Sequence, residues 1–149
     1  MRARVILLVE DNPDDIDLTL RAFSGHRDAQ EVVVARDGNE ALEYLHGPRA
    51  GAMRVLSPLP GVVLLDLKLP KLNGLEVLRR IRAHARTKLM PVVVLTSSRE
   101  DRDLADSYKL GANSYIRKPV DYEAFERVAE ELRHYWLSLN EPPPVGAAV

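Results

Sequence analysis

Four short strand-like runs in the sequence end on residues that can bind a cation or take part in phosphoryl chemistry. Glu10 and Asp11 follow VILLV, Asp66 follows VVLL, Thr96 ends VVVLT and Lys118 follows SYIR. If these runs are parallel strands, their carboxyl ends meet at one edge of a sheet, where ligands of open α/β folds bind. We therefore expect three carboxylates, a hydroxyl and an ammonium group to converge on one crevice.

Such a crevice would be electrostatically unfavourable without a cation. Two like charges about 4 Å apart repel by roughly 4 kcal/mol at an effective dielectric constant near 20. All-oxygen ligands predict Mg²⁺, with Mn²⁺ as an alternative. An aspartate beside that cation and Lys118 could attack a phosphorus centre, while the Thr96 hydroxyl could donate to a phosphoryl oxygen. The product of that reaction is an acyl phosphate.

The elements that must position these groups alternate along the chain. Short β-branched runs predict strands at 5–9, 31–35, 61–65, 91–96 and 113–117. Apolar residues at helical spacing lie between them, for example Ile16, Leu20 and Phe23, then Leu75, Leu78 and Ile81. This alternation predicts a doubly wound α/β fold with helices on both faces of a parallel sheet.

The character of the runs indicates the strand order. The first, third and fourth runs are almost continuously hydrophobic, as expected for strands buried on both faces, whereas EVVVAR and NSYIRK carry polar flanks and suit the edges. With right-handed crossovers these constraints are satisfied by the flavodoxin-like order 2-1-3-4-5, although they do not exclude every other order.

Start and stop signals flank the predicted helices. Caps are expected at Asn12, which precedes Pro13, at Asp37 and at Asn73, and left-handed glycines at Gly25, Gly47 and Gly111. The segment 47–60 is unusually long for a connection, so it is either a functional loop or a continuation of the second helix.

The same motifs resemble the receiver domains of two-component response regulators over nearly the whole chain. They are VILLVEDN, VVLLDLKLPKLNG, VVVLTSS and ANSYIRKPVD. The resemblance implies that Asp66 is the phosphoacceptor and that Lys118 contacts the phosphoryl group. It implies that Glu10, Asp11, Asp66 and the carbonyl of Lys68 organise Mg²⁺, that Thr96 and Tyr115 form the switch pair, and that Lys118-Pro119 is a cis-proline turn.

A narrower resemblance is to stand-alone regulators paired with phytochrome-type histidine kinases. It depends on the long segment before the third strand, LTSSREDRDL and the ending YWLSLNEPP. The function this implies is that of a phosphoacceptor signalling protein rather than an enzyme, with a sensor histidine kinase, a bacteriophytochrome in this subfamily, as partner.

Composition sets the remaining bounds. The chain has 149 residues, a net charge of -1 and no cysteine, which excludes disulfides and thiolate metal sites. We expect one receiver domain at 1–140, a Pro-rich flexible tail at 141–149, no attached output domain, no nucleic-acid or membrane binding, and a cytoplasmic location.

Three other functions are alternatives to the phosphoacceptor. An aspartate-dependent phosphatase would carry Asp-x-Asp after the first strand, but Lys68 stands two positions after Asp66, on the third. A flavin carrier would need a phosphate loop where Glu10 to Pro13 would repel phosphate. A degenerate receiver that serves only as a docking module is disfavoured by the intact set of residues.

Individual residues also have purely structural interpretations. Asp14 and Asp15 could serve only the helix dipole, and Tyr115 could be edge-strand packing. Arg79, Arg82 and Arg86 share a helical face that could contact a kinase or nucleic acid, but a solvated face is the preferred interpretation.

The last predicted helix is longer than one core face requires. Its apolar stripe comprises Phe125, Val128, Ala129, Leu132, Trp136 and Leu139, with Tyr135 beside it. The sequence therefore predicts a homodimer through the fourth helix, fifth strand and fifth helix, the alternative being a monomer that packs these aromatics internally.

Overall fold

The computed structural model describes residues 5–24, 30–47 and 59–144, in which strands and helices alternate as predicted. The elements are β1 (Val5–Val9), α1 (Pro13–Ser24), β2 (Glu31–Ala35), α2 (Gly38–His46), β3 (Val62–Leu65), α3 (Gly74–Ala83), β4 (Val92–Thr96), α4 (Asp101–Lys109), β5 (Ser114–Arg117), α5 (Tyr122–His134) and a π-helical turn, η1 (Tyr135–Leu139). None of the helices in these ranges is long and apolar enough to cross a bilayer.

The strands form one parallel sheet in the order β2-β1-β3-β4-β5, which confirms the predicted order. Every residue of β3 and β4 is buried, whereas β2 and β5 at the edges keep partly exposed positions. The hydrophobic runs thus identified the central strands because only those strands are covered on both faces.

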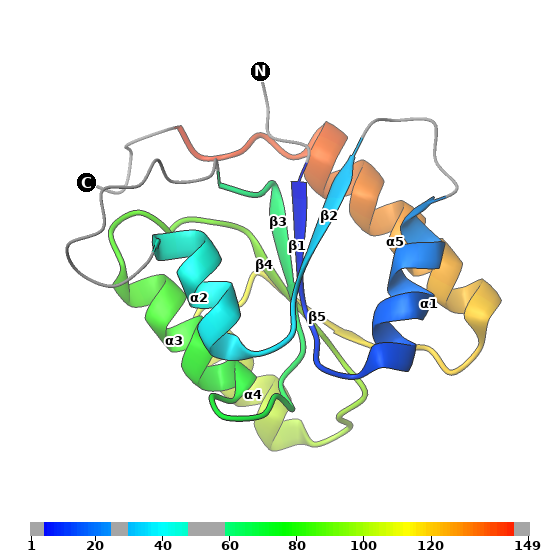
Figure 1. Cartoon of the computed structure of the whole chain (residues 1–149), viewed down its shortest axis with the longest axis horizontal. Coiled ribbons are helices and arrows are strands. Elements are labelled where there is room, and N and C mark those ends of the chain that lie inside the picture. Colours follow the sequence, from blue (N-terminus) through cyan, green and yellow to red (C-terminus); the bar gives the residue numbers. More distant parts are fainter. Residues whose placement is uncertain (1–4, 25–29, 48–58, 145–149) are drawn as a thin grey trace.

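Two hydrophobic cores lie on opposite faces of the sheet, each under one of the two helix layers that Figure 1 shows. Leu7 and Val9 of β1 point into the core under α2 and α3, whereas Ile6 and Leu8 point into the core under α1 and α5. This alternation is the two-residue period of a strand. Leu20 departs from the predicted stripe on α1, since it is exposed while Ala22 is buried.

The helix-start signals operate as predicted. Asn12 Oδ1 accepts from the backbone N–H groups of Asp14 and Asp15, and Asp37 and Asn73 cap α2 and α3 in the same way. Gly47 and Gly111 adopt φ angles of 85° and 99°. Since α2 ends at His46, the second helix does not continue directly into 47–60; residues 48–58 and Gly25 lie outside the described residues.

The end of the C-terminal helix differs from the prediction. A continuous 3.6-residue period would place Leu139 on the buried stripe, but Leu139 is 62% exposed and Leu137 is 4% exposed. The π-helical turn at Tyr135–Leu139 contains an extra residue, so it rotates the following side chains relative to the α-helical stripe. Residues 141–144 of the predicted tail have no regular structure, and 145–149 lie outside the described residues.

The arginines of the α3 segment correct another prediction. Arg82 is partly buried and donates to the carbonyls of Gly111 (2.9 Å) and Met90 (2.7 Å) and to Oδ1 of Asn113 (2.8 Å). Arg86 Nε donates to the carbonyl of Leu45 at 3.1 Å. Only Arg79, which pairs with Glu76, fits a solvated face, because the other two satisfy loop and helix-end carbonyls that periodicity alone could not reveal.

Candidate functional site

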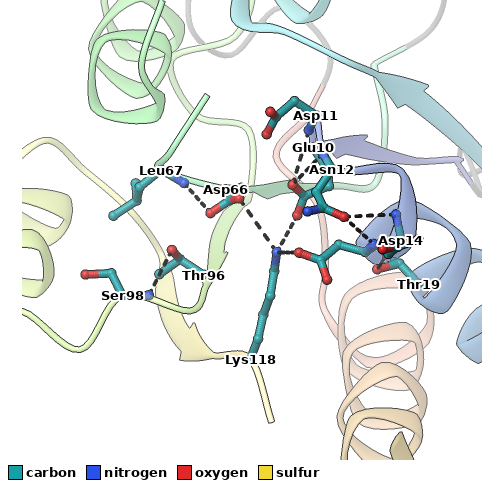
Figure 2. Close-up of polar contacts among 11 residues, drawn as sticks. Glu10, Asp11, Asn12, Asp14, Thr19, Asp66, Leu67, Thr96, Ser98 and Lys118 are labelled. Atoms are coloured by element: carbon teal, nitrogen blue, oxygen red, sulfur yellow. Dashed lines mark hydrogen bonds and ion pairs between the residues drawn. The ribbon is translucent and has the colours of Figure 1, made fainter. Parts of the chain in front are cut away.

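The charged residues predicted at the strand ends meet at the carboxyl edge of the sheet (Figure 2). Glu10 and Asp66 are buried, at 2% and 9% exposure, and Asp11 is exposed. They come from the ends of β1 and β3, which are adjacent strands, so the fold brings together carboxylates far apart in sequence. Lys118 follows β5 and reaches toward them across the end of β4.

The ammonium group of Lys118 lies among three carboxylates. It forms an ion pair with Glu10, lies 3.1 Å from Oδ2 of Asp15, and lies 3.6 Å from Oδ2 of Asp66. Burial would lower the pKa of Lys118, but the hydrogen bond to Glu10 and the negative charges of Asp66 and Glu10 raise it above its usual value. Lys118 is therefore a cation at neutral pH.

Glu10 is held on both carboxylate oxygens. Its backbone N–H donates to the carbonyl of Ala35 at 3.0 Å, its Oε2 accepts from the N–H groups of Asp11 and Asn12, and its Oε1 accepts from Lys118. Burial nevertheless raises its pKa to about 7, because the hydrogen bonds from Lys118 and Asn12 do not offset the desolvation and the charge of Asp66.

Asp66 is positioned by the backbone around it. Its N–H donates to the carbonyl of Val9 at 3.1 Å, and its Oδ1 accepts from the N–H of Leu67 at 2.8 Å. Oδ2 is the oxygen nearer Lys118, so one carboxylate oxygen is fixed while the other faces a cation. Such an oxygen is a candidate nucleophile.

Gly74 is a site residue that sequence reasoning missed as such. A Cβ atom at this position would lie 2.3 Å from the carbonyl oxygen of Asp66 and 2.6 Å from Cα of Leu67. Only glycine lets α3 start this close to the strand end. The signal in the sequence was the Asn73-Gly74 pair, which was interpreted only as a helix start.

The acidic cluster has the composition of a site for a hard divalent cation. One carboxylate oxygen from each of Glu10, Asp11 and Asp66 lies within 4.8 Å of the others. Lys118 compensates one of these charges, and it is shared with Asp15. Oxygen donors with excess negative charge fit Mg²⁺ or Mn²⁺, and the exposed position of Asp11 leaves access for the waters that these ions retain.

Asp15 is the second residue whose position at the site was not predicted. It was considered only as a partner of the helix dipole, but its carboxylate pairs with Lys118. Its place in the first turn of α1 was the available signal, because that turn begins at the same edge of the sheet as Glu10.

Thr96 and Tyr115 lie beside the acidic cluster and meet at one residue. Thr96 is fully buried, and its Oγ1 accepts from the N–H of Ser98 at 3.3 Å. The Tyr115 hydroxyl donates to the carbonyl of Ser98 at 3.5 Å. The strands that carry the pair are joined here, since the Lys118 N–H donates to the Thr96 carbonyl at 2.8 Å.

Two further predictions concern residues near the site, namely the carbonyl of Lys68 and the peptide bond at Lys118-Pro119. Lys68 lies two residues after Asp66 with an exposed side chain. The prediction of a cis peptide bond at Lys118-Pro119 is wrong, since this bond is trans in the structure. An X-Pro bond prefers trans by only about 0.5–1 kcal/mol, so the dipeptide alone does not determine its isomer.

One curated relative matches nearly the whole chain. The probable methanogenesis regulatory protein FilR2 of Methanothrix harundinacea (strain 6Ac) is 43% identical over 139 residues, which cover 93% of this chain and 87% of that protein.

Solved structures of phytochrome response regulators are similar over their whole length. The phosphorylated cyanobacterial phytochrome response regulator RcpA has a TM-score of 0.85 and 37% identity, and the match covers 96% of this chain and 100% of that one. The Mn²⁺-bound form of response regulator Rcp1 has a TM-score of 0.83 and 34% identity, with 95% and 99% covered. The bacteriophytochrome response regulator AtBRR has a TM-score of 0.72 and 50% identity, with 95% and 100% covered.

Sequence comparison with known families agrees with the fold and the site. Residues 6–130 match the response regulator receiver domain. This range contains β2 to β5, all of β1 except Val5, and every residue of the acidic cluster. The chain therefore belongs to the response regulator receiver domain family.

Proposed function

We propose that this protein is a signalling phosphoacceptor that takes a phosphoryl group onto Asp66 from a sensor histidine kinase. The observation that carries the proposal is the setting of Asp66, a buried carboxylate with one oxygen held by the Leu67 N–H and the other 3.6 Å from the Lys118 ammonium. A carboxylate in this setting suits phosphoryl transfer, because its nucleophilic oxygen and a stabilising cation are adjacent.

The transfer step has a simple balance. A bond forms between an Asp66 carboxylate oxygen and phosphorus, the bond between phosphorus and the donor histidine nitrogen breaks, and that nitrogen keeps the electron pair. Lys118 neutralises charge on the phosphoryl oxygens. The Thr96 hydroxyl accepts from the Ser98 N–H in the resting protein, so its own hydrogen is available to donate to the phosphoryl group.

The acidic cluster supplies the ligands for the expected divalent cation. Glu10, Asp11 and Asp66 would hold Mg²⁺, or Mn²⁺, together with the carbonyl of Lys68. When bound, the cation supplies positive charge that stabilises the transferring phosphoryl oxygens. The Mn²⁺-bound structure of Rcp1, a similar protein, supports this assignment.

The partner is a sensor histidine kinase of the phytochrome type. The support is the similarity to RcpA and AtBRR, which are described as response regulators of a phytochrome and of a bacteriophytochrome. After transfer, Thr96 and Tyr115 act as the switch pair that alters the surface formed by α4, β5 and α5.

The same surface carries a homodimer interface in this proposal. Tyr135 and Leu139 on η1 are exposed, and Tyr135 and Trp136 line a groove of about 430 Å³ together with side chains of β5 and α5, among them Ile116 and Val128. Sedimentation of the wild type and Leu139→Glu tests it, because Leu139 is exposed whereas Trp136 packs against the core. We expect a wild-type dimer that Leu139→Glu dissociates, and a wild-type monomer at micromolar concentration would contradict the interface.

The test of phosphoacceptance is intact-mass measurement after incubation with acetyl phosphate. We expect the wild type to gain the mass of one phosphoryl group when Mg²⁺ is present and to gain none in EDTA. Asp66→Asn should gain none in either condition, while Asp17→Asn, which alters an exposed carboxylate on α1, should match the wild type. Equal modification of Asp66→Asn and the wild type would refute the proposal.

A further inference from the structure

Ser98 makes three contacts that join separate parts of the switch region. It is 4% exposed; its N–H donates to Thr96 Oγ1, its carbonyl accepts from the Tyr115 hydroxyl, and its Oγ donates to Oδ2 of Asp103 at 2.6 Å. Asp103 lies in the first turn of α4. One residue therefore contacts both members of the switch pair and the helix that follows them; Thr96 and Ser98 are seen together in Figure 2.

The contact with Asp103 is the strongest of the three. A hydroxyl that donates to a carboxylate at 2.6 Å forms a charge-assisted hydrogen bond, about twice as strong as a neutral one. The same Oγ accepts from the N–H of Glu100 at 3.3 Å. The hydroxyl therefore contacts both the residue that precedes α4 and the first turn of α4. The side chain of Glu100, at the helix cap position, makes no capping hydrogen bond.

The packing of α4 makes this bond important. Among residues Asp101–Lys109 only Ser107 is buried, and Tyr108 is exposed, so little apolar contact holds this helix to the sheet. Its C-terminal end has firm attachments, because the Ala112 N–H donates to the Ser107 carbonyl and Arg82 donates to the Gly111 carbonyl. At the N-terminal end, Asp101 forms only an exposed ion pair with Arg117 at 4.0 Å, so the hydrogen bond between Ser98 and Asp103 is the stronger attachment there.

We propose that Ser98 is a positioning residue that couples the Thr96 hydroxyl to α4 through the carboxylate of Asp103. This inference rests on the proposed phosphoryl transfer to Asp66, which would draw Thr96 Oγ1 toward the new phosphoryl oxygens. The Ser98 N–H follows Thr96, and its Oγ carries the first turn of α4 with it. The helix pivots about its attached C-terminal end, so the change at Asp66 reaches the α4 surface as a rotation.

Backbone hydrogen exchange measured by mass spectrometry, before and after acetyl phosphate and Mg²⁺, tests this coupling. Ser98→Ala and Asp103→Ala remove the bond, Asp103→Asn keeps an acceptor, and Asp106→Ala is the matched control, since its carboxylate faces Arg102 on the same helix. In resting protein we expect amides of 98–104 to exchange about tenfold faster in the two bond-deleting variants, the effect of losing one hydrogen bond to a charged group. After phosphorylation we expect the exchange of 101–109 to change in the wild type, in Asp106→Ala and in Asp103→Asn.

The decisive result is the response of α4 in Ser98→Ala. It should gain the same phosphoryl mass as the wild type yet show less than half of the wild-type exchange change in 101–109. An undiminished change would overturn the coupling even though phosphoacceptance stands. If the wild type gains no mass, the proposed function fails instead. The hydrogen exchange of the resting proteins then still tests the anchoring of α4, because equal exchange in Ser98→Ala and Asp106→Ala would overturn the anchoring role. Ser98→Ala removes one oxygen atom only, so it serves if Asp103→Ala does not fold.

Discussion

Charged groups at the two ends of the sheet are balanced in opposite ways. At the carboxyl end, the ammonium of Lys118 faces Glu10, Asp15 and Asp66, so negative charge exceeds positive charge. At the amino end of β4 and β5, the guanidinium of Arg82 faces only neutral acceptors, which are the carbonyls of Thr87, Lys88, Met90 and Gly111 and the amide of Asn113. The carboxyl end is therefore arranged to accept further positive charge, whereas at the amino end the N–H donors of the guanidinium already have acceptors.

The partners of a charged residue determine whether it stabilises the fold or takes part in ligand binding. A guanidinium whose N–H groups donate to neutral carbonyls fixes loops, and those donors are then occupied and not offered to a ligand. A group of carboxylates that share one ammonium stores repulsion that a ligand can relieve. Variants at both ends of the sheet test this difference.

Arg82→Ala should lower the free energy of unfolding by about 3 kcal/mol, because it leaves several partly buried carbonyls without a donor. Urea denaturation measures the loss. Arg79→Ala is the control, since Arg79 forms an exposed pair with Glu76 and should leave the urea midpoint near that of the wild type. Equal effects of the two variants would contradict the structural role of Arg82, and the folded fraction of Arg82→Ala should still accept a phosphoryl group.

Asp11→Asn should weaken Mg²⁺ binding by about tenfold or more, because it removes one of three clustered carboxylates. Isothermal titration calorimetry with MgCl₂ measures the affinity. Asp14→Asn, one turn further on and also exposed, is the matched control and should leave the affinity near that of the wild type. An unchanged affinity in Asp11→Asn would remove Asp11 from the site.

The amino end of the sheet also carries a histidine pair that predicts a pH effect. The rings of His46 and His84 stack with centroids 3.8 Å apart, and Thr87 Oγ1 donates to the Ile81 carbonyl, so Nε2 of His46 must donate to Thr87. Burial, followed by the nearby charges of His84 and Arg86, lowers the pKa of His46 to about 4.

Because the folded pKa of His46 lies below its unfolded value near 6.5, its contribution to stability is present above pH 6.5 and is lost as the pH falls toward 4. Each pKa unit corresponds to about 1.4 kcal/mol, and since the ring is partly exposed we expect a loss of about 1 kcal/mol. Urea denaturation at pH 7.5 and 4.5 measures the change in the free energy of unfolding. Glu10, whose raised pKa acts in the opposite direction, is present in every variant, so the contribution of His46 appears as a difference between variants. The change should be about 1 kcal/mol less favourable in the wild type and in His134→Gln, whose histidine is exposed, than in His46→Gln. An equal change in all three proteins would rule out His46 as its source.

Asp66→Asn should raise the free energy of unfolding in EDTA by about 0.5 to 1 kcal/mol, because it removes one of the mutually repelling carboxylates. This is opposite in sign to the effect of Arg82→Ala and is the most direct test of the comparison. Urea denaturation in EDTA and in Mg²⁺ measures both states. A destabilised Asp66→Asn in EDTA would mean that the carboxylates are compensated without a cation.

The strand order and the three carboxylates could be predicted because both follow from pattern. Continuous apolar runs identify β3 and β4 as central, and parallel strands place Glu10, Asp66 and Lys118 at the same edge. The remaining features depend on geometry that the pattern does not contain. Ser98 and Asp103 meet through a loop conformation, Arg82 reaches carbonyls contributed by two loops, and Leu137 replaces Leu139 only because the last turn is not α-helical.

The π-helical turn at Tyr135–Leu139 has a consequence for which side chains this surface presents. One residue corresponds to about 100° around a helix axis, so if the same residues wound as an α-helix, Leu139 would move toward the side now occupied by Leu137. An outward aromatic and aliphatic face would be exchanged for a different one without the substitution of any amino acid. The winding of the last turn therefore selects the outward face, a property that a comparison of residue identities alone would overlook.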